Sequence, residues 1–312
     1  MTRIAIAGAG GFAQILAQHI SQTAHALLVL SRTAHPELQY YCPESQAVIV
    51  DYDDVEGLRY TLQGVDLVIS TISGNEQLNL IDAARKARVK TFVPSEFEGS
   101  LSHRPAIDPL DRGSQSALQF LERWSQSKSH RMRYTVFSCG IFMERFSPGG
   151  MQTLGIGAGC GVQGPDDYLV NLQGARAEII ATTPSGTEAR VSMTSVHDVA
   201  QFVTAALDIS LNNWPKEFKM RGDSMTVQEL VQACSNTVGT PFMLVTRHYQ
   251  EVEAQVQACQ ESGDWVQWHY FHRLLQTASE RYHIRQPNLN DLTQVQPMKF
   301  ETWLESTWSP SL

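Results

Sequence analysis

The chain has 312 residues, of which 42% are hydrophobic and 18% charged, as expected for a globular protein with one large or two modest domains. Its formal net charge of -8 argues against general binding to nucleic acid or to a membrane surface. No apolar run approaches the length of a membrane span, and the N-terminal residues lack the pattern of a signal peptide.

The five cysteines are Cys42, Cys139, Cys160, Cys234 and Cys259, and none forms a Cys-x-x-Cys pair. An odd number of widely spaced cysteines indicates reduced, packed thiols. We therefore expect a cytoplasmic protein without a metal site. The sequence leaves its oligomeric state open between a monomer and a homodimer.

The stretch 3–20 predicts a short buried strand, a glycine turn and the first turns of a helix. Residues 4–7 alternate Ile and Ala without a charge, as in a strand covered on both faces. Glycines also end ordinary strands, but a glycine turn between a strand and a helix is the context that a diphosphate site requires. The candidate cofactor-binding residues here are Gly8, Gly10, Gly11, Phe12 and Ala13.

The second expected strand, 25–30, ends at Ser31 and Arg32. In a dinucleotide-binding fold, an acid just past this strand selects the free ribose 2′-hydroxyl of NAD(H). Here no acid occurs before Glu37, and the guanidinium of Arg32 can pair with a 2′-phosphate instead. The pattern favours NADP(H), although a solvated surface arginine would look the same.

The chain continues as alternating strands and helices with short connections, which predicts an α/β, doubly wound parallel sheet of the Rossmann type. The further expected strands are 47–50, 65–70, 91–93 and 134–138, and the expected helices are 55–62, 77–87 and 115–124. Thr71 and Ser73 follow the fourth strand, where the crevice of such a sheet binds its ligand.

Beyond Met143 the sequence becomes rich in glycine and less regular, which predicts a smaller mixed domain. A strand and an apolar-periodic helix over 190–207 indicate one return to the first domain. We expect 1–146 plus about 188–210 to form an NADP-binding domain. Residues 147–187 plus 211–312 would then form a substrate-binding domain.

Residues Phe92–Phe97 read Phe-Val-Pro-Ser-Glu-Phe. Together with the glycine turn, Ser31-Arg32 and the 190–207 segment, they resemble the isoflavone reductase-like and NmrA-like group of atypical short-chain dehydrogenases. The resemblance implies an NADP(H)-holding Rossmann domain and a small C-terminal domain that closes a pocket over the nicotinamide. It also implies small aromatic or alkaloid-like substrates, with some regulatory members that bind nucleotide without turnover.

The resemblance also assigns residues. The group's cofactor-lining positions correspond here to Gly8, Gly11, Phe12, Arg32, Thr71, Pro94, Ser95, Glu96 and Phe97. Cys139 to Met143, which includes Phe142, corresponds to the border of the nicotinamide end. For the substrate, the candidates are Phe97, Met143, Trp265 and Trp268, although aromatic residues at helical spacing also suit a core.

One departure from the group concerns catalysis. Its reductases carry a lysine at the start of the helix after the long loop, and here Ser114 stands near that position, with the next lysine at Lys128. No tyrosine has a lysine four residues later, so the acid of the ordinary short-chain dehydrogenases is also missing.

Reduction of a ketone or an enone needs a proton donor, whereas an iminium accepts hydride without one. The missing lysine therefore favours imine or iminium reduction, or a cofactor-assisted cyclisation. Arg112, Ser114 and Glu96 are the candidate catalytic residues, but Arg112 could instead pair in solvent with Asp108 or Asp111, and Glu96 could only shape its loop. The alternatives are a regulatory NADP sensor and a purely structural Rossmann module.

Overall fold

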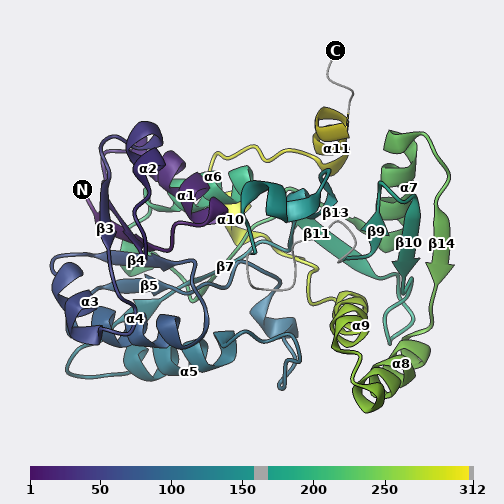
Figure 1. Ribbon diagram of the computed structural model, residues 1–312, viewed down its shortest axis with the longest axis horizontal. Coiled ribbons are helices and arrows are strands. Elements are labelled where there is room, and N and C mark those ends of the chain that lie inside the picture. The colour runs from purple at the N-terminus through teal and green to yellow at the C-terminus, as the bar shows by residue number, and fades with distance from the viewer. Residues whose placement is uncertain (158–167, 309–312) are drawn as a thin grey trace. The chain divides into compact units, whose positions relative to one another are not determined.

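The computed structural model describes residues 1–157 and 168–308. The chain divides into two compact units (Figure 1). Unit 1 comprises Met1–Phe97, Asp111–Phe137 and Ala200–Phe218, and unit 2 comprises Glu98–Leu110, Ser138–Val199 and Lys219–Leu312. The functional division into a cofactor domain and a substrate domain stays a prediction.

Unit 1 contains a six-stranded parallel sheet in the order β3-β2-β1-β4-β5-β6. Its strands are β1 (Arg3–Ala7), β2 (Ala26–Ser31), β3 (Gln46–Ile49), β4 (Leu67–Ser70), β5 (Thr91–Val93) and β6 (Arg133–Tyr134). The intervening helices are α1 (Gly11–Ser21), α2 (Pro36–Tyr41), α3 (Val55–Thr61), α4 (Gly74–Lys86) and α5 (Ser114–Ser125). The strand order reverses at the boundary between β1 and β4, because the chain crosses from β3 at one edge to β4 on the other side of β1; this confirms the predicted doubly wound Rossmann topology.

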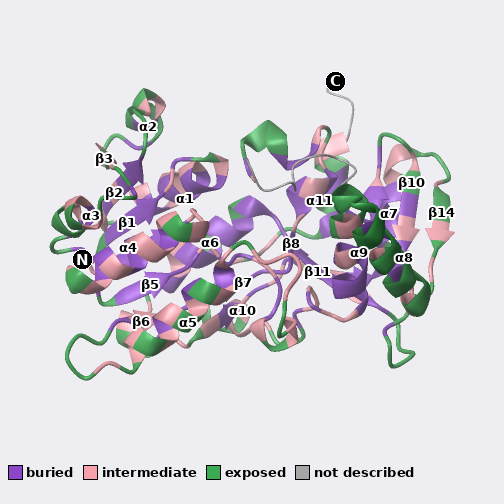
Figure 2. Cartoon of the chain, turned by 60° about the horizontal axis from the view of Figure 1, so that its bottom comes forward, coloured by how far each residue is buried: buried purple, intermediate pink, exposed green. Residues whose placement is uncertain are grey.

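The apolar pattern of the central strands explains their position. Residues Ile4–Ala7 of β1 are buried (Figure 2), and so is all of β4, as strands covered on both faces must be. The helices α3, α4 and α5 pack against one another in that order. On α4, Leu80, Ile81 and Ala84 recur at helical spacing and form part of the core of this unit.

The expected strand 134–138 is divided in the structure. β6 ends at Tyr134, and β7 (Val136–Ser138) pairs with β12 (Glu217–Lys219) in a separate two-stranded sheet. Thr135 marks the change: its backbone amide still donates to Phe92, while its hydroxyl donates to the carbonyl of Pro215 at 2.8 Å. Hydrophobicity alone does not reveal this change of pairing, because all three residues of β7 are buried apolar or small residues.

Unit 2 is built on two three-stranded sheets, β14-β10-β9 and β13-β11-β8. Their strands are β8 (Ile141–Phe142), β9 (Val170–Asn171), β10 (Arg176–Ile179), β11 (Arg190–Thr194), β13 (Asp223–Thr226) and β14 (Met243–Thr246). The helices of this unit are α7 (Val227–Val238), α8 (Tyr249–Ser262), α9 (Trp265–Ala278), α10 (Asn288–Leu292) and α11 (Phe300–Trp308). The helix α6 (Val196–Ala206) begins in unit 2 and continues into unit 1 from Ala200. The second, mixed domain expected from sequence is therefore confirmed as a fold.

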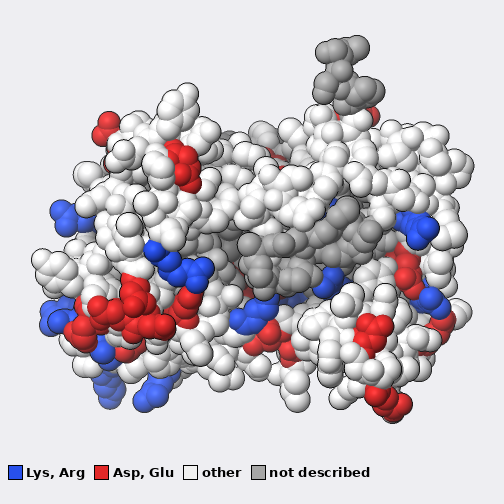
Figure 3. All heavy atoms as spheres, in the orientation of Figure 1, with Lys and Arg blue, Asp and Glu red and all other residues white. Residues whose placement is uncertain are grey.

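Charged side chains of both signs are interspersed on the face shown in Figure 3. Acidic side chains gather over α3 and α4, where Glu56 pairs with Arg59 at 2.7 Å and Asp82 pairs with Lys86 at 3.1 Å. Over the described parts of the chain, no helix is long and apolar enough to cross a bilayer. Within the same parts, no cluster of three or more His, Cys, Asp or Glu could hold a metal ion.

Four of the cysteines, Cys42, Cys139, Cys234 and Cys259, are buried free thiols. Cys160 lies outside the described residues. The expectation of reduced, packed thiols agrees with these four positions.

The turn after β1 is held by hydrogen bonds to two neighbouring strands. The amide of Gly8 donates to Leu30 of β2 at 2.9 Å, and Thr71, just after β4, donates its hydroxyl to the carbonyl of Ala7 at 2.8 Å. Gly8 has φ +109°, and a Cβ there would lie 2.2 Å from the Thr71 hydroxyl oxygen. Both the backbone conformation and the lack of space therefore require glycine.

We expect Gly8→Ala to lower the free energy of unfolding by about 3 kcal/mol or more, because it combines a left-handed backbone with a steric overlap. Gly186→Ala is the matched control, since Gly186 has φ +85° but a Cβ there would meet no heavy atom of the described residues within 4 Å. The control should lose only about 1 kcal/mol. Equal losses of unfolding free energy in urea denaturation would show that the overlap with Thr71 does not destabilise the Gly8→Ala variant.

A buried carboxyl group accepts a hydrogen bond at the N-terminus of α6, whose first residues belong to unit 2. Glu144 is 4% exposed and accepts a hydrogen bond from the amide of Val196 at 3.0 Å. Burial raises the pKa of Glu144 to about 7, and the nearby charge of Asp198 adds to the increase. Asp198 itself accepts from the amide of Met298 at 3.0 Å. Glu144 is thus partly ionised near neutral pH at a site where ionisation is unfavourable.

This raised pKa predicts a pH dependence of stability. The folded-state pKa of Glu144 lies above the ordinary value of 4.5, so the protonated carboxyl group is favoured in the folded state. The contribution of this protonation to stability is fully present below pH 4.5 and is lost as the pH rises through 7. Relative to Glu144→Gln, the wild type should lose on the order of 2–3 kcal/mol of unfolding free energy across this range. Urea denaturation at several pH values measures the difference, and a constant difference would contradict the assignment.

Candidate functional site

The glycine turn presents the N-terminus of α1 at the carboxyl ends of the unit 1 strands. Gly10 occupies the N-cap position and so provides no capping side chain, and the first turn of α1 contains no acidic residue. Gln14 closes the turn by donating its side-chain amide to the carbonyl of Ala9 at 3.0 Å. An uncapped helix N-terminus with no carboxylate in its first turn suits a diphosphate, so the residues Gly8, Gly10, Gly11, Phe12 and Ala13 fit the predicted cofactor.

Two hydroxyl residues follow β4 at the same end of the sheet. Thr71 uses its hydroxyl to hold the carbonyl of Ala7, so its first role is to fix the glycine turn. Ser73 is the N-cap residue of α4, but its side chain makes no capping hydrogen bond to this described helix. Ser73 therefore suits a contact with a ligand better than Thr71 does.

The segment Pro94–Phe97 forms a tight turn after β5, in which the amide of Glu96 donates to the carbonyl of Pro94 at 2.7 Å. Pro94 and Glu96 are buried, whereas Ser95 is partly exposed. Phe97 packs edge-to-face on Phe12, with ring centroids 4.8 Å apart. The structure thus brings this turn and the glycine turn into direct contact.

One residue of this site, Gln77, was not predicted from the sequence. It lies in the first turn of α4, and its side-chain oxygen accepts a hydrogen bond from the amide of Ser95 at 2.7 Å. The sequence does offer one indication of its role: Gln77 stands three and four residues before the buried Leu80 and Ile81, and so lies on the same face of the helix. A polar residue on the apolar face of a helix indicates a specific hydrogen bond.

Arg32, the residue predicted to select NADP(H), follows β2 and is largely solvent-exposed. Its guanidinium lies 3.1 Å from the carboxylate of Glu76 in the first turn of α4. An exposed ion pair of this kind contributes little to stability. The guanidinium is therefore available to exchange Glu76 for a phosphate at small cost.

The predicted catalytic residues near α5 differ in accessibility. Ser114 is the first residue of the helix and is 7% exposed, while Arg112 is exposed. Asp111 accepts from the amides of Gly113 and Gln115, and Asp108 pairs with Arg104 at 3.1 Å. The two acids considered as partners for Arg112 thus have other contacts.

Lys128 cannot replace the missing lysine. It follows the C-terminal end of α5, whereas Ser114 begins the helix. A helix of this length spans about 18 Å at 1.5 Å per residue. The side chain of Lys128 therefore cannot reach the position that Ser114 occupies at the start of the helix.

In unit 2, Cys139, Phe142 and Met143 lie on and beside β8. Cys139 and Met143 are fully buried, and Phe142 is partly exposed. The amide of Cys139 donates to Glu98 at 2.8 Å, and its carbonyl accepts from the Thr194 hydroxyl at 2.7 Å. Phe142 is thus the most accessible of the three, and its contact with a cofactor stays a prediction.

The two tryptophans proposed for substrate contact lie on one face of α9. Trp265 is 53% exposed and packs on Trp268, which in turn packs edge-to-face on His272 with ring centroids 4.2 Å apart. Trp268 also borders the unit 2 core. Trp268 is thus partly a core residue, whereas Trp265 has the exposure that a ligand contact needs.

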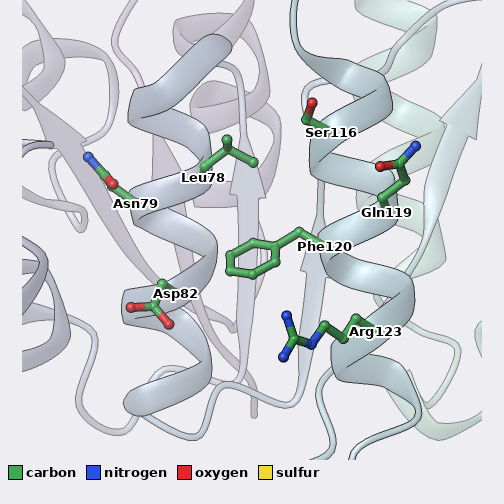
Figure 4. Close-up of a pocket in the computed structure, with 7 residues that line it drawn as sticks. All are labelled: Leu78, Asn79, Asp82, Ser116, Gln119, Phe120 and Arg123. Atoms are coloured by element: carbon green, nitrogen blue, oxygen red, sulfur yellow. The ribbon is translucent and has the colours of Figure 1, made fainter.

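A groove of about 500 Å³ lies elsewhere in unit 1, between α4 and α5. Leu78 and Phe120 point toward each other into the space between these helices (Figure 4). The lining residues are Leu78, Asn79, Asp82, Ser116, Gln119, Phe120 and Arg123. None of them belongs to the predicted cofactor or catalytic sets, so the chemistry of the strand ends is separate from this groove.

Comparisons with known proteins agree with this arrangement. The model of the NmrA-like family matches residues 1–262. The chain is 27% identical over 298 residues to the oxidoreductase BOA1 of Botryotinia fuckeliana, covering 89% of this chain and 92% of that protein. It is 30% identical over 155 residues to the isoflavone reductase homolog A622-like of Nicotiana tabacum, covering 46% of this chain and 49% of that one.

A solved structure is similar in fold. The NADPH-dependent quinone oxidoreductase QOR2 of Escherichia coli, complexed with NADPH, has a TM-score of 0.68 and 16% identity, covering 97% of this chain and 99% of that chain. The family match extends over most of the sequence and includes both the glycine turn and the Pro94–Phe97 turn. The chain therefore belongs to the NmrA-like family, as the resemblance predicted.

Proposed function

We propose that this protein is an NADP(H)-dependent oxidoreductase that acts on a small aromatic or alkaloid-like secondary metabolite. The observation that carries the proposal is the contact between two turns at the strand ends: the uncapped N-terminus of α1 beside Gly8, and the Pro94–Phe97 turn packed on it through Phe12. The oxidoreductase name of one relative and the bound NADPH of a structural neighbour support it.

Within this function, the substrate is an imine or an iminium ion, or the reaction is a cofactor-assisted cyclisation. When bound, NADPH supplies a hydride from its nicotinamide ring. The serine hydroxyl of Ser114 can donate a hydrogen bond but is no acid at neutral pH, and the Arg112 guanidinium stays protonated. These two side chains can orient a substrate and stabilise negative charge, whereas neither supplies the proton that a ketone or an enone needs.

The presence of Ser114 in place of the usual lysine equally favours a second function, that of a regulatory NADP sensor without turnover. Such a protein needs the nucleotide site and does not need a proton donor. The two functions require the same proposed cofactor contacts in unit 1, so nucleotide binding alone does not separate them.

Removal of the Arg32 guanidinium tests the proposed preference for NADP(H). Arg32→Ala should weaken NADPH binding about tenfold or more and leave NADH binding within about twofold, because only NADPH carries the 2′-phosphate. Glu76→Gln is the matched control, since it removes the other member of the ion pair and should not weaken NADPH binding. Titration calorimetry measures both affinities. Equal losses for the two nucleotides would dismiss the 2′-phosphate assignment.

Turnover with different substrates tests the proposed reaction. Purified protein with NADPH should consume the cofactor in the presence of cyclic imines and not with simple enones, because only the imine, once protonated in solution, needs no acid from the protein. Loss of absorbance at the NADPH band measures the reaction. Reduction of enones without reduction of imines would contradict the substrate class. Tight binding of NADPH without consumption across imines, enones and indoles would favour the sensor.

A further inference from the structure

Gln77 is a fully buried amide on the apolar face of α4. Its neighbours at helical spacing, Leu80, Ile81 and Ala84, are core residues. Burying an amide among such residues is unfavourable unless both of its polar atoms form hydrogen bonds. The position therefore calls for a specific use of the side chain.

The carbonyl oxygen Oε1 has a clear use. It accepts from the backbone amide of Ser95 at 2.7 Å and so ties the first turn of α4 to the Pro94–Phe97 turn. The hydrogen bond from Glu96 to Pro94 closes the same turn from within. Gln77 thus fixes the segment whose last residue, Phe97, packs on the glycine turn through Phe12.

The amide nitrogen Nε2 has no hydrogen-bond partner among the described residues, although it is inaccessible to solvent. An unsatisfied buried donor costs about 1–3 kcal/mol. A leucine would fill the space without this cost, and a glutamate would accept the Ser95 hydrogen bond equally well. A glutamine combines that acceptor with a donor, which indicates that the donor is used in another state of the protein.

We infer that Gln77 is a positioning residue for cofactor binding: Oε1 orders the Pro94–Phe97 turn, and Nε2 donates a hydrogen bond to an oxygen acceptor in the NADP(H)-bound state. The inference rests on the proposed function, because it takes NADP(H) as the ligand of these strand ends. It assigns to Gln77 a role in affinity that acts through Ser95 and its turn. A residue that only fills the core would have no such role.

The test measures the NADPH dissociation constant and the apo-protein melting temperature of three variants. Gln77→Leu removes both polar atoms and should raise the dissociation constant about tenfold. Gln77→Glu keeps the acceptor and makes the donor depend on protonation. Its NADPH affinity should fall with rising pH, unlike that of the wild type, because an ionised carboxylate cannot donate. Ile81→Val, a fully buried core change on the same helix, should lower the melting temperature slightly and leave the affinity within about twofold.

Wild-type affinity in folded Gln77→Leu would overturn the inference. Should Gln77→Leu fail to fold, the pH profile of Gln77→Glu decides, and a profile parallel to that of the wild type would overturn it. If wild-type protein itself fails to bind NADPH, the proposed function fails and the inference fails with it. That outcome is recognised by the wild-type titration alone.

Discussion

The candidate site depends on the close approach of β4 to the turn that follows β1. Thr71 donates to the carbonyl of Ala7 and leaves no room for a side chain on Gly8. Gly8 is fixed from the other side by its hydrogen bond to β2. With the turn held between two strands, the axis of α1 and the direction of its N-terminal amides are set by the sheet.

Two further contacts connect the glycine turn and α4 to the turn after β5. Gln77 connects α4 to the turn after β5, and Phe97 connects that turn to Phe12 at the start of α1. Three segments far apart in the sequence are therefore held together by one hydrogen bond and one pair of rings. The proposed binding surface is built from segments that contact one another at the strand ends, whereas the sequence lacks the lysine that reductases of the resembling group carry. This combination is the basis for the proposed reaction, which needs orientation of the substrate and no acid from the protein.

Much of this arrangement could be predicted from the sequence. The alternation of apolar strands and amphipathic helices, the glycine turn and the Pro94–Phe97 tetrapeptide were enough for the fold class and the family, because each depends on local patterning. The division at Thr135 could not be predicted, since the partner of β7 is a strand about 80 residues later and buried apolar residues suit either sheet.

Gln77 was missed for a related reason: its role depends on a hydrogen bond to the backbone of Ser95, which no side-chain pattern records. The cofactor and substrate roles of Phe142, Met143, Trp265 and Trp268 stay predictions, because they depend on contacts with a ligand.

The most direct test of the proposed nucleotide site is a crystal structure of the protein with NADP⁺ bound. We expect the diphosphate to lie at the N-terminus of α1 against Gly10 and Gly11, and the 2′-phosphate to contact Arg32. The Pro94–Phe97 turn should line the bound cofactor. A diphosphate bound away from α1, or crystals that stay free of nucleotide at millimolar NADP⁺, would contradict this assignment.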